Sequence, residues 1–216
     1  MTLWNDRLEA YRSSPTHASD ADLDTVVALC EPHDGLRALD VATGGGHVAR
    51  RLREAGAEVV TTDAAAGMQP DVVAPAESLP FEDGSFDVVV TRIAPHHFSD
   101  IRAAVGEMAR VSRETVVVED TLFTSDEVEE AEKLRDPSHG QNYTEAEWRS
   151  FLEGAGLSVV HVEEFRKTHV LDDWLARTGC EGATASRVRE LLADVTGAGG
   201  TTWQDTKIIL KAKKKV

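Results

Sequence analysis

The sequence has few of the residues that mark disulfide-rich, zinc-stabilised or membrane-spanning proteins. It contains two cysteines, Cys30 and Cys180, with no C-x-x-C pair and no His/Cys cluster at metal-ligand spacing. No run of about 18 apolar residues occurs, and the first residues have neither a basic nor an apolar targeting segment. We therefore expect a soluble, cytoplasmic protein in which both cysteines are buried thiols, and no metal site is indicated.

Positive charge is also scarce. The chain has 23 Lys and Arg against 38 Asp and Glu, a formal net charge of −15. A surface of this charge repels the phosphates of nucleic acids and of anionic membranes. The composition therefore predicts a small-molecule substrate, with no nucleic-acid or membrane partner, and it is compatible with a homodimer.

Segments in which apolar residues recur at helical spacing alternate along the chain with segments in which they recur at strand spacing. This alternation is typical of an α/β fold with a parallel sheet. The length of 216 residues suits one domain, 1–216. Within it we expect a helical segment at 1–34, a cofactor-binding half at 35–120 and a substrate-side half at 121–216. Strands are predicted at 37–42, 57–62, 71–73, 86–91, 115–119, 159–165 and 206–213. Helices are predicted at 3–12, 20–30, 47–55, 99–111, 125–134 and 144–153, with two short ones before the last strand.

The segment LDVATGGGH places Asp40 at the end of a predicted strand and follows it with a glycine loop. Gly44, Gly46 and Ala49 fit the dinucleotide pattern G-x-G-x-x-A, so an NAD-type oxidoreductase is one alternative. A carboxylate at this loop would repel a pyrophosphate and attract a ligand with ammonium and sulfonium groups. Asp63 ends the next strand, where it can accept hydrogen bonds from ribose hydroxyls. Together the two acids favour a nucleoside site.

Residues from about 38 to 112 resemble the class I methyltransferases of type 11, which are related to the ubiquinone and menaquinone C-methyltransferases. The resemblance rests on LDVATGGG, on Asp63, on AESLPFEDGSFDVV and on TRIAPHHFSD. SPTHASDADL and RDPSHGQNYTEAEWRSFLEGAGL are similar to segments that cover the substrate in one subgroup. The resemblance implies a Rossmann-like methyltransferase fold, with a mostly parallel sheet and an antiparallel last strand, and S-adenosyl-L-methionine as cofactor.

The resemblance also implies roles for individual residues. The methionine moiety would be held by Asp40, Ala42, Thr43, Gly44 and Gly46. Asp63 and Ala64 would hold the ribose, and Ala76, Glu77 and Ser78 would flank the adenine. Arg92 and Ile93 would lie beside the sulfonium.

The sequence departs from the family pattern on the adenine side. Only twelve residues separate Asp63 from Ala76, where the family has a helix and a further strand. Pro75 replaces the acid that usually meets the adenine amine, and proline offers neither a side-chain acceptor nor an amide donor. We therefore expect a sheet shortened between its second and fourth strands, with weakened cofactor affinity or an adenine contact supplied by Asp71, Glu77 or water. A methyltransferase-fold protein with a non-methylating or cofactor-sensing role is thus a second alternative.

Methyl transfer to oxygen or carbon gains from a general base, and imidazole has a suitable pKa. The expected acceptor is a quinone-like, phenolic or natural-product molecule. The candidate bases are His96, His97 and His139, each of which could equally be a solvated or capping histidine.

Other residues are expected around the acceptor. Asp120, at the end of a strand, could line the substrate side. Tyr11, Arg135 and Tyr143 are candidate substrate contacts, against the alternative that they pack or cap. The acidic run EDTLFTSDEVEEAE is expected to form a solvated helix face.

Overall fold

A mixed sheet runs through the centre of the computed structural model, which describes Leu8, Arg12, residues 21–197 and residues 199–215. The sheet has seven strands in the order β3-β2-β1-β4-β5-β7-β6. Their bounds are β1 Arg37–Val41, β2 Glu58–Asp63, β3 Val72–Val73, β4 Phe86–Arg92, β5 Ser112–Thr121, β6 Leu157–Val170 and β7 Thr202–Lys214. The predicted Rossmann-like α/β sheet is confirmed.

The strands from β1 to β5 pair in parallel, while β7 is antiparallel to both of its neighbours, β5 and β6. Parallel neighbours need a crossover, and helices α4 (His47–Glu54) and α5 (Ile101–Val111) provide two of these. The carboxyl ends of the parallel strands therefore meet at one edge of the sheet. This is the edge at which open α/β sheets bind ligands.

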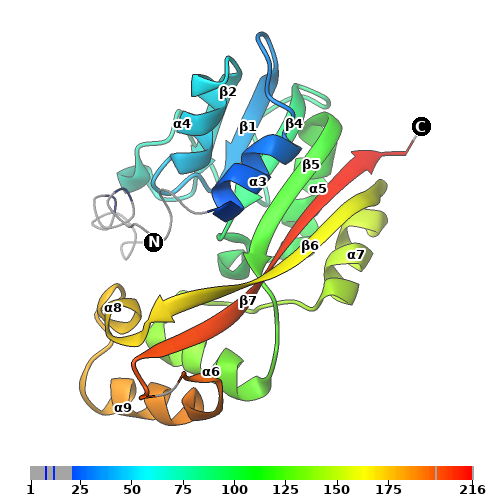
Figure 1. The fold of residues 1–216 in the computed structure, drawn as a ribbon. Helices are drawn as coiled ribbons and strands as arrows, with labels where there is room; N and C mark the ends of the chain where they lie inside the picture. The colour runs from blue at the N-terminus through cyan, green and yellow to red at the C-terminus, as the bar shows by residue number, and fades with distance from the viewer. Residues whose placement is uncertain (1–7, 9–11, 13–20, 198, 216) are drawn as a thin grey trace.

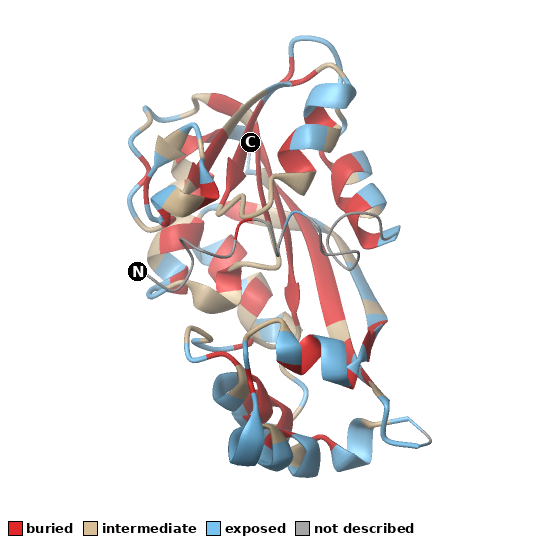
Figure 2. Cartoon of the chain, turned by 90° about the vertical axis from the view of Figure 1, so that its left-hand side faces the viewer, coloured by how far each residue is buried: buried red, intermediate tan, exposed pale blue. Residues whose placement is uncertain are grey.

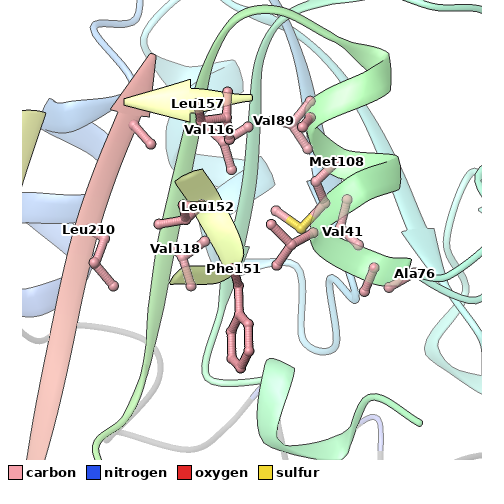
Figure 3. Packing of buried hydrophobic residues seen from close by; sticks show 14 of the residues in the cluster. Val41, Ala76, Val89, Met108, Val116, Val118, Phe151, Leu152, Leu157 and Leu210 are labelled. Carbon is pink, nitrogen blue, oxygen red and sulfur yellow. The ribbon is translucent and has the colours of Figure 1, made fainter. Parts of the chain in front are cut away.

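Helices cover both faces of the sheet, so its central strands are apolar on both sides and read as continuous valine runs. Val88, Val90 and Val117 pack against α3 (Ala21–Leu29) and α4. The alternate residues Val89, Val116 and Val118 pack against α5 and α7 (Glu145–Gly154) on the opposite face (Figure 3). Figure 2 shows the result, a buried sheet between helices that expose only their outer faces.

The connection from β2 to β4 is short, as predicted. A single 3-10 turn, η1 (Ala66–Met68), stands where the related family has a helix, and β3 has only two residues. Of the predicted amino-terminal helices, the second corresponds to α3. The first, at 3–12, lies almost entirely outside the described residues.

β6 and β7 extend well beyond their predicted ranges as a long twisted ribbon (Figure 1). Charged residues such as Lys167 and Asp205 interrupt the apolar pattern there, yet they are buried in the folded ribbon. The far half of the ribbon carries α6 (Asp126–Arg135), α8 (Leu171–Ala176) and α9 (Gly182–Leu191), and we call these helices with that half of the ribbon the ribbon module. A separate apolar cluster holds it together and includes Val128, Leu171, Trp174, Val188 and Trp203.

Among the described residues, none of the helices has the length and apolar character needed to cross a membrane.

Candidate functional site

The carboxyl ends of β1, β2 and β4 line a cleft of about 410 Å³, called here the glycine-loop cleft. Most of the residues predicted to hold a cofactor line it. They are Asp40, Ala42, Thr43, Gly44, Asp63, Ala64, Ala76, Glu77, Arg92 and Ile93. Gly46 and Ser78 lie next to lining residues in sequence and shape the turns beside the cleft, since their amides donate to Thr43 and Pro75 carbonyls.

The loop after β1 depends on left-handed backbone conformations. Gly44 has φ +51° and Gly46 has φ +75°, values that glycine adopts at little cost. Ala42 has φ +55°, although its Cβ disfavours this region.

Two carboxylates face this cleft from neighbouring strands. Asp40 is 2% exposed, and its Oδ2 accepts hydrogen bonds from Thr43 Oγ1 (2.7 Å) and the Ala49 amide (3.2 Å). Burial outweighs these bonds and raises the pKa of Asp40 to about 6. Asp63 accepts the Gly44 and Ala65 amides at 3.1 and 2.9 Å, and burial raises its pKa also. Paired acids here suit a ligand with cationic and hydroxyl groups and oppose a pyrophosphate.

On the predicted adenine side, one of the two candidate acids is excluded. Asp71 accepts hydrogen bonds from the amide and the hydroxyl of Thr61, both at 2.9 Å, and is not among the lining residues. Glu77 does line the cleft. Its Oε1 accepts the Ser99 amide at 2.7 Å, which ties it to the segment before α5. Pro75 lines the cleft beside it.

Arg92 lies at the edge of the cleft, but its guanidinium belongs to a buried ion cluster. Nη2 is 2.7 Å from Asp22 Oδ2, and Nε is 2.7 Å from Glu119 Oε2. Lys167 Nζ is 3.0 Å from the same Asp22 oxygen. The resemblance placed Arg92 beside the sulfonium, and this stays a prediction. In the structure the guanidinium is part of an ion cluster that joins α3 to β4, β5 and β6.

Ile93, the residue after β4, has φ +52°, which is a rare conformation for a β-branched residue. Such a conformation costs about 1–3 kcal/mol and persists only where surrounding contacts enforce it. The Ile93 amide donates to the Glu119 carbonyl at 2.8 Å, which is one such contact. Ile93 lines both the glycine-loop cleft and a second, polar cavity.

This polar cavity, of about 60 Å³, brings the three predicted catalytic histidines together. The His96 ring centroid lies 4.1 Å from that of His97 and 5.2 Å from that of His139. His96 and His97 come from the turn η2 (Pro95–His97). The chain after α6 is fixed against them, because the Gly140 amide donates to the His96 carbonyl at 2.8 Å.

His96 and Asp120 form a close pair, with 2.5 Å between Nδ1 and Oδ1. Asp120 is fully buried at the end of β5, and its Oδ2 has no hydrogen-bond partner among the residues that the structure describes. Burial raises the pKa of Asp120 to about 7 and holds the pKa of His96 well below its usual range. His97 Nδ1 lies 3.0 Å from the Ser138 carbonyl, and burial together with His96 lowers the pKa of His97 to about 3.

The three residues predicted to contact the substrate differ in where the structure places them. Arg135 lines the polar cavity, where its guanidinium lies 4.1 Å over the Trp174 ring. Tyr143 does not line it; its ring packs edge-on against Trp148 and Phe151 in the core. Tyr11 lies outside the described residues.

Several residues of the polar cavity were not predicted from the sequence. The ribbon contributes Lys167, His169, Asp205 and Lys207. Lys207 Nζ lies 2.8 Å from Asp205 Oδ2, and His169 Nε2 lies 3.1 Å from the same oxygen. Polar residues two positions apart on each strand share a face, and that period was the signal available in the sequence.

The acidic segment on α6 also differs from its prediction as a solvated face. Glu129 and Glu132 are 8% and 6% exposed, and both face the chain around His139. Burial raises the pKa of Glu132 to about 7.

Comparisons with known proteins agree with this geometry. The methyltransferase domain family model matches residues 39–118. The uncharacterized methyltransferase YcgJ of Bacillus subtilis is 28% identical over 91% of this chain and 85% of its own. A demethylmenaquinone methyltransferase of Beutenbergia cavernae is 38% identical over 37% of each chain.

Solved structures show the same arrangement over most of the chain. The BH2331 protein of Bacillus halodurans superposes with a TM-score of 0.82 at 26% identity, covering 91% of this chain and 100% of that one. YcgJ superposes with a TM-score of 0.82 at 25% identity, covering 90% and 98%. Together with the glycine loop and the paired acids of the cleft, these matches support an S-adenosylmethionine-dependent methyltransferase, to whose domain model residues 39–118 of this chain are similar.

Proposed function

We propose that this enzyme methylates a polar group of a small molecule bound in the polar cavity, using S-adenosylmethionine held in the glycine-loop cleft. One observation carries the proposal. Ile93 and His97 line both spaces, so the cleft and the cavity meet at the end of β4. A donor in one and an acceptor in the other would therefore face each other across these two residues.

The residues of the cleft fit this cofactor. Asp40 would hold the ammonium group, and the two oxygens of Asp63 would accept the ribose hydroxyls. Pro75 and Ala76 offer an apolar wall for the adenine, with Glu77 beside them. When bound, the cofactor supplies an electrophilic methyl group. The volume of about 410 Å³ lies within the range of small-molecule and cofactor pockets, roughly 300–1,000 Å³.

The protein's own contribution is alignment and proton acceptance. Holding two reactants in line in a water-poor site can lower a barrier by about 7–11 kcal/mol. The His96–Asp120 pair is placed to accept a proton from an oxygen or carbon acceptor, with Asp120 orienting the imidazole. His97 separates the two spaces and positions the acceptor.

The residues that line the polar cavity limit the chemical classes of acceptor that could bind there. Lys167, Arg135, Asp136 and Asp205 are among its walls, so charged and hydrogen-bonding groups would find partners there. The cavity of about 60 Å³ is much smaller than a typical small-molecule pocket, so only a polar group of the acceptor, such as a phenolic or quinone oxygen, would enter it. A long isoprenoid tail would have to lie outside it.

Calorimetric titration with S-adenosylmethionine, S-adenosylhomocysteine and NAD tests the cofactor. We expect micromolar binding of both sulfur nucleosides, lost in Asp63→Ala, and no binding of NAD. Binding of NAD alone would overturn the proposal in favour of an oxidoreductase.

A screen of phenolic, quinone and polar metabolites for S-adenosylhomocysteine formation tests the transfer. With an acceptor in hand, His96→Asn should lower kcat by about 100-fold or more while leaving S-adenosylhomocysteine affinity unchanged. Equal kcat values in the two proteins would remove His96 from the mechanism.

A further inference from the structure

Helix α6 buries two carboxylates that its sequence would place in solvent. Glu129 and Glu132 are three residues apart, so they project from the same face of the helix. Val128 and Ala131, their neighbours, pack in the core of the ribbon module. A buried carboxylate requires a compensating charge or a set of hydrogen bonds, since burial disfavours its ionised form.

An imidazole lies between these two carboxylates. His139 Nε2 is 3.3 Å from Glu129 Oε1 and 3.7 Å from Glu132 Oε2. One ligand atom from each of the three residues can be chosen so that all lie within 4.8 Å of one another. Donors about 2.0–2.2 Å from a common ion lie roughly 3.0–3.5 Å apart, so small side-chain movements would complete such a site.

Asn142 provides a second, independent observation. Its side chain is 1% exposed, and its amide nitrogen donates to Glu132 Oε2. The oxygen of that same amide group is buried, and within the described part of the chain it has no hydrogen-bond partner. The Asn142 main-chain amide donates to Glu129 Oε2 at 3.2 Å. One residue thus orients both carboxylates in the way that outer-shell groups orient metal ligands.

Lys207 and Arg135 already favour the ionised form of Glu132 electrostatically, so a bound cation would add to charges that act on this carboxylate from a distance. Among the described residues, no lysine or arginine nitrogen lies within 4.0 Å of a Glu132 oxygen. Glu129 does pair with Lys133 at 3.0 Å, but the Lys133 side chain is 47% exposed and can turn to solvent. Glu132 and His139 also line the polar cavity, so an ion between them would be open to it.

We infer that Glu129, Glu132 and His139 bind one divalent transition-metal ion in the wall of the polar cavity. Carboxylate oxygens suit Mn²⁺, while an imidazole with carboxylates suits Zn²⁺, so these two ions fit the donor set. Resting on the proposed function, an ion at this place would hold an oxygen of the acceptor. It would thereby favour oxygen acceptors over carbon acceptors.

Titration of the chelator-treated full-length protein with Zn²⁺ alone, and separately with Mn²⁺ alone, tests the site. We expect saturable binding of one equivalent by calorimetry, with the ring resonances of His139 shifting in NMR spectra. Glu132→Gln and His139→Asn should each weaken binding by about 100-fold or more. Glu127→Gln, on the exposed face of the same helix, should leave the affinity unchanged.

Two outcomes would overturn the inference. One is the absence of saturable binding by either ion in the unmodified protein. The other is binding that leaves the His139 resonances in place, or that Glu127→Gln weakens as much as Glu132→Gln. The NMR measurement needs no variant, so poor folding of Glu132→Gln would not obscure the answer.

The titration contains no S-adenosyl compound, so its result is separate from that of the proposed function. Metal binding without S-adenosylhomocysteine binding would leave the metal site standing and remove the methyl transfer. The reverse pattern would leave a methyltransferase whose acceptor is positioned by side chains alone.

Discussion

Asp40 shows how burial prepares a single side chain for its ligand. Its pKa of about 6 lies above the usual range because the carboxyl is removed from water. Below this pKa the group is neutral and no longer attracts an ammonium ion. We therefore expect the affinity for S-adenosylhomocysteine to fall as the pH is lowered from 8 to 5, by up to about tenfold per pH unit below the pKa.

Calorimetry at several pH values in the wild type and in Asp40→Asn measures this effect. The variant carries no titrating group at the position, so its affinity should be weaker and nearly independent of pH. The same pH profile in both proteins would assign the dependence to another group.

The same ionisation affects folding in a defined direction. A carboxyl with a raised pKa in the folded state stabilises the protein at low pH relative to neutral pH. This contribution is fully present below the unfolded-state pKa and is lost as the pH rises through about 6. At neutral pH the charge of Asp40 in the cleft therefore lowers the stability of the folded protein.

At the scale of elements, the ion cluster around Asp22 fixes α3 to the sheet. The Asp22 side chain is 1% exposed and contacts both Arg92 and Lys167. Burial disfavours its charge, but these two cations outweigh that effect and hold its pKa below the usual range. Removing one partner of a buried pair leaves the other charges uncompensated.

Asp22→Asn should therefore lower the free energy of unfolding by about 3–5 kcal/mol, measured by urea denaturation at neutral pH. Asp24→Asn is the matched control on the same helix. Asp24 pairs with Arg51 at 2.6 Å, but its side chain is 64% exposed. Its loss should cost about 1 kcal/mol or less. Similar costs for the two variants would show that the buried cluster contributes no more than a surface pair.

The elements also show what the sequence can and cannot predict. Periodicity found the β1 and β4 strands and α5, because their apolar residues recur at a fixed spacing. The short β2–β4 connection was predicted in another way, because only twelve residues separate Asp63 from Ala76 where the resembling family has a helix and a further strand. Periodicity failed in the ribbon, where polar residues such as Lys167 and Asp205 are buried against one another. In the sequence such residues resemble solvent-exposed ones.

Some site residues could likewise be predicted from the sequence, and others could not. The histidines were brought together as expected because each follows a strand end or a helix end at one edge of the sheet. The role of Arg92 depended on Asp22, which lies 70 residues away in sequence. No local pattern reports a partner at that distance.

At the scale of the whole molecule, the ribbon module and the sheet are stabilised by separate apolar clusters. Trp203, 1% exposed, is the centre of the ribbon module, where its ring lies 4.6 Å from that of Trp174. Trp148, fully buried, packs in the cluster beneath the sheet. Replacing a buried tryptophan by alanine costs about 3–5 kcal/mol. Each substitution should therefore loosen its own part of the molecule first.

Hydrogen exchange measures this division. In Trp203→Ala we expect α8 and α9 to lose protection while β1 and β4 keep it, and S-adenosylhomocysteine binding to persist. In Trp148→Ala the loss should begin at α7. Uniform loss of protection in both variants would show that the ribbon module and the sheet unfold as one unit.

The contact between the two spaces has an evolutionary consequence. Among the described residues, the linings of the glycine-loop cleft and the polar cavity share Ile93 and His97. Apart from His96, the rest of the polar cavity's lining comes from residues beyond 120, where the cleft has no lining residue. Substitutions in α6, α8 and the ribbon can therefore alter one lining while the other is inherited unchanged. Descendants of such a chain can acquire new acceptors by drift in the ribbon module alone, with Ile93 and His97 as the two positions that constrain both halves at once.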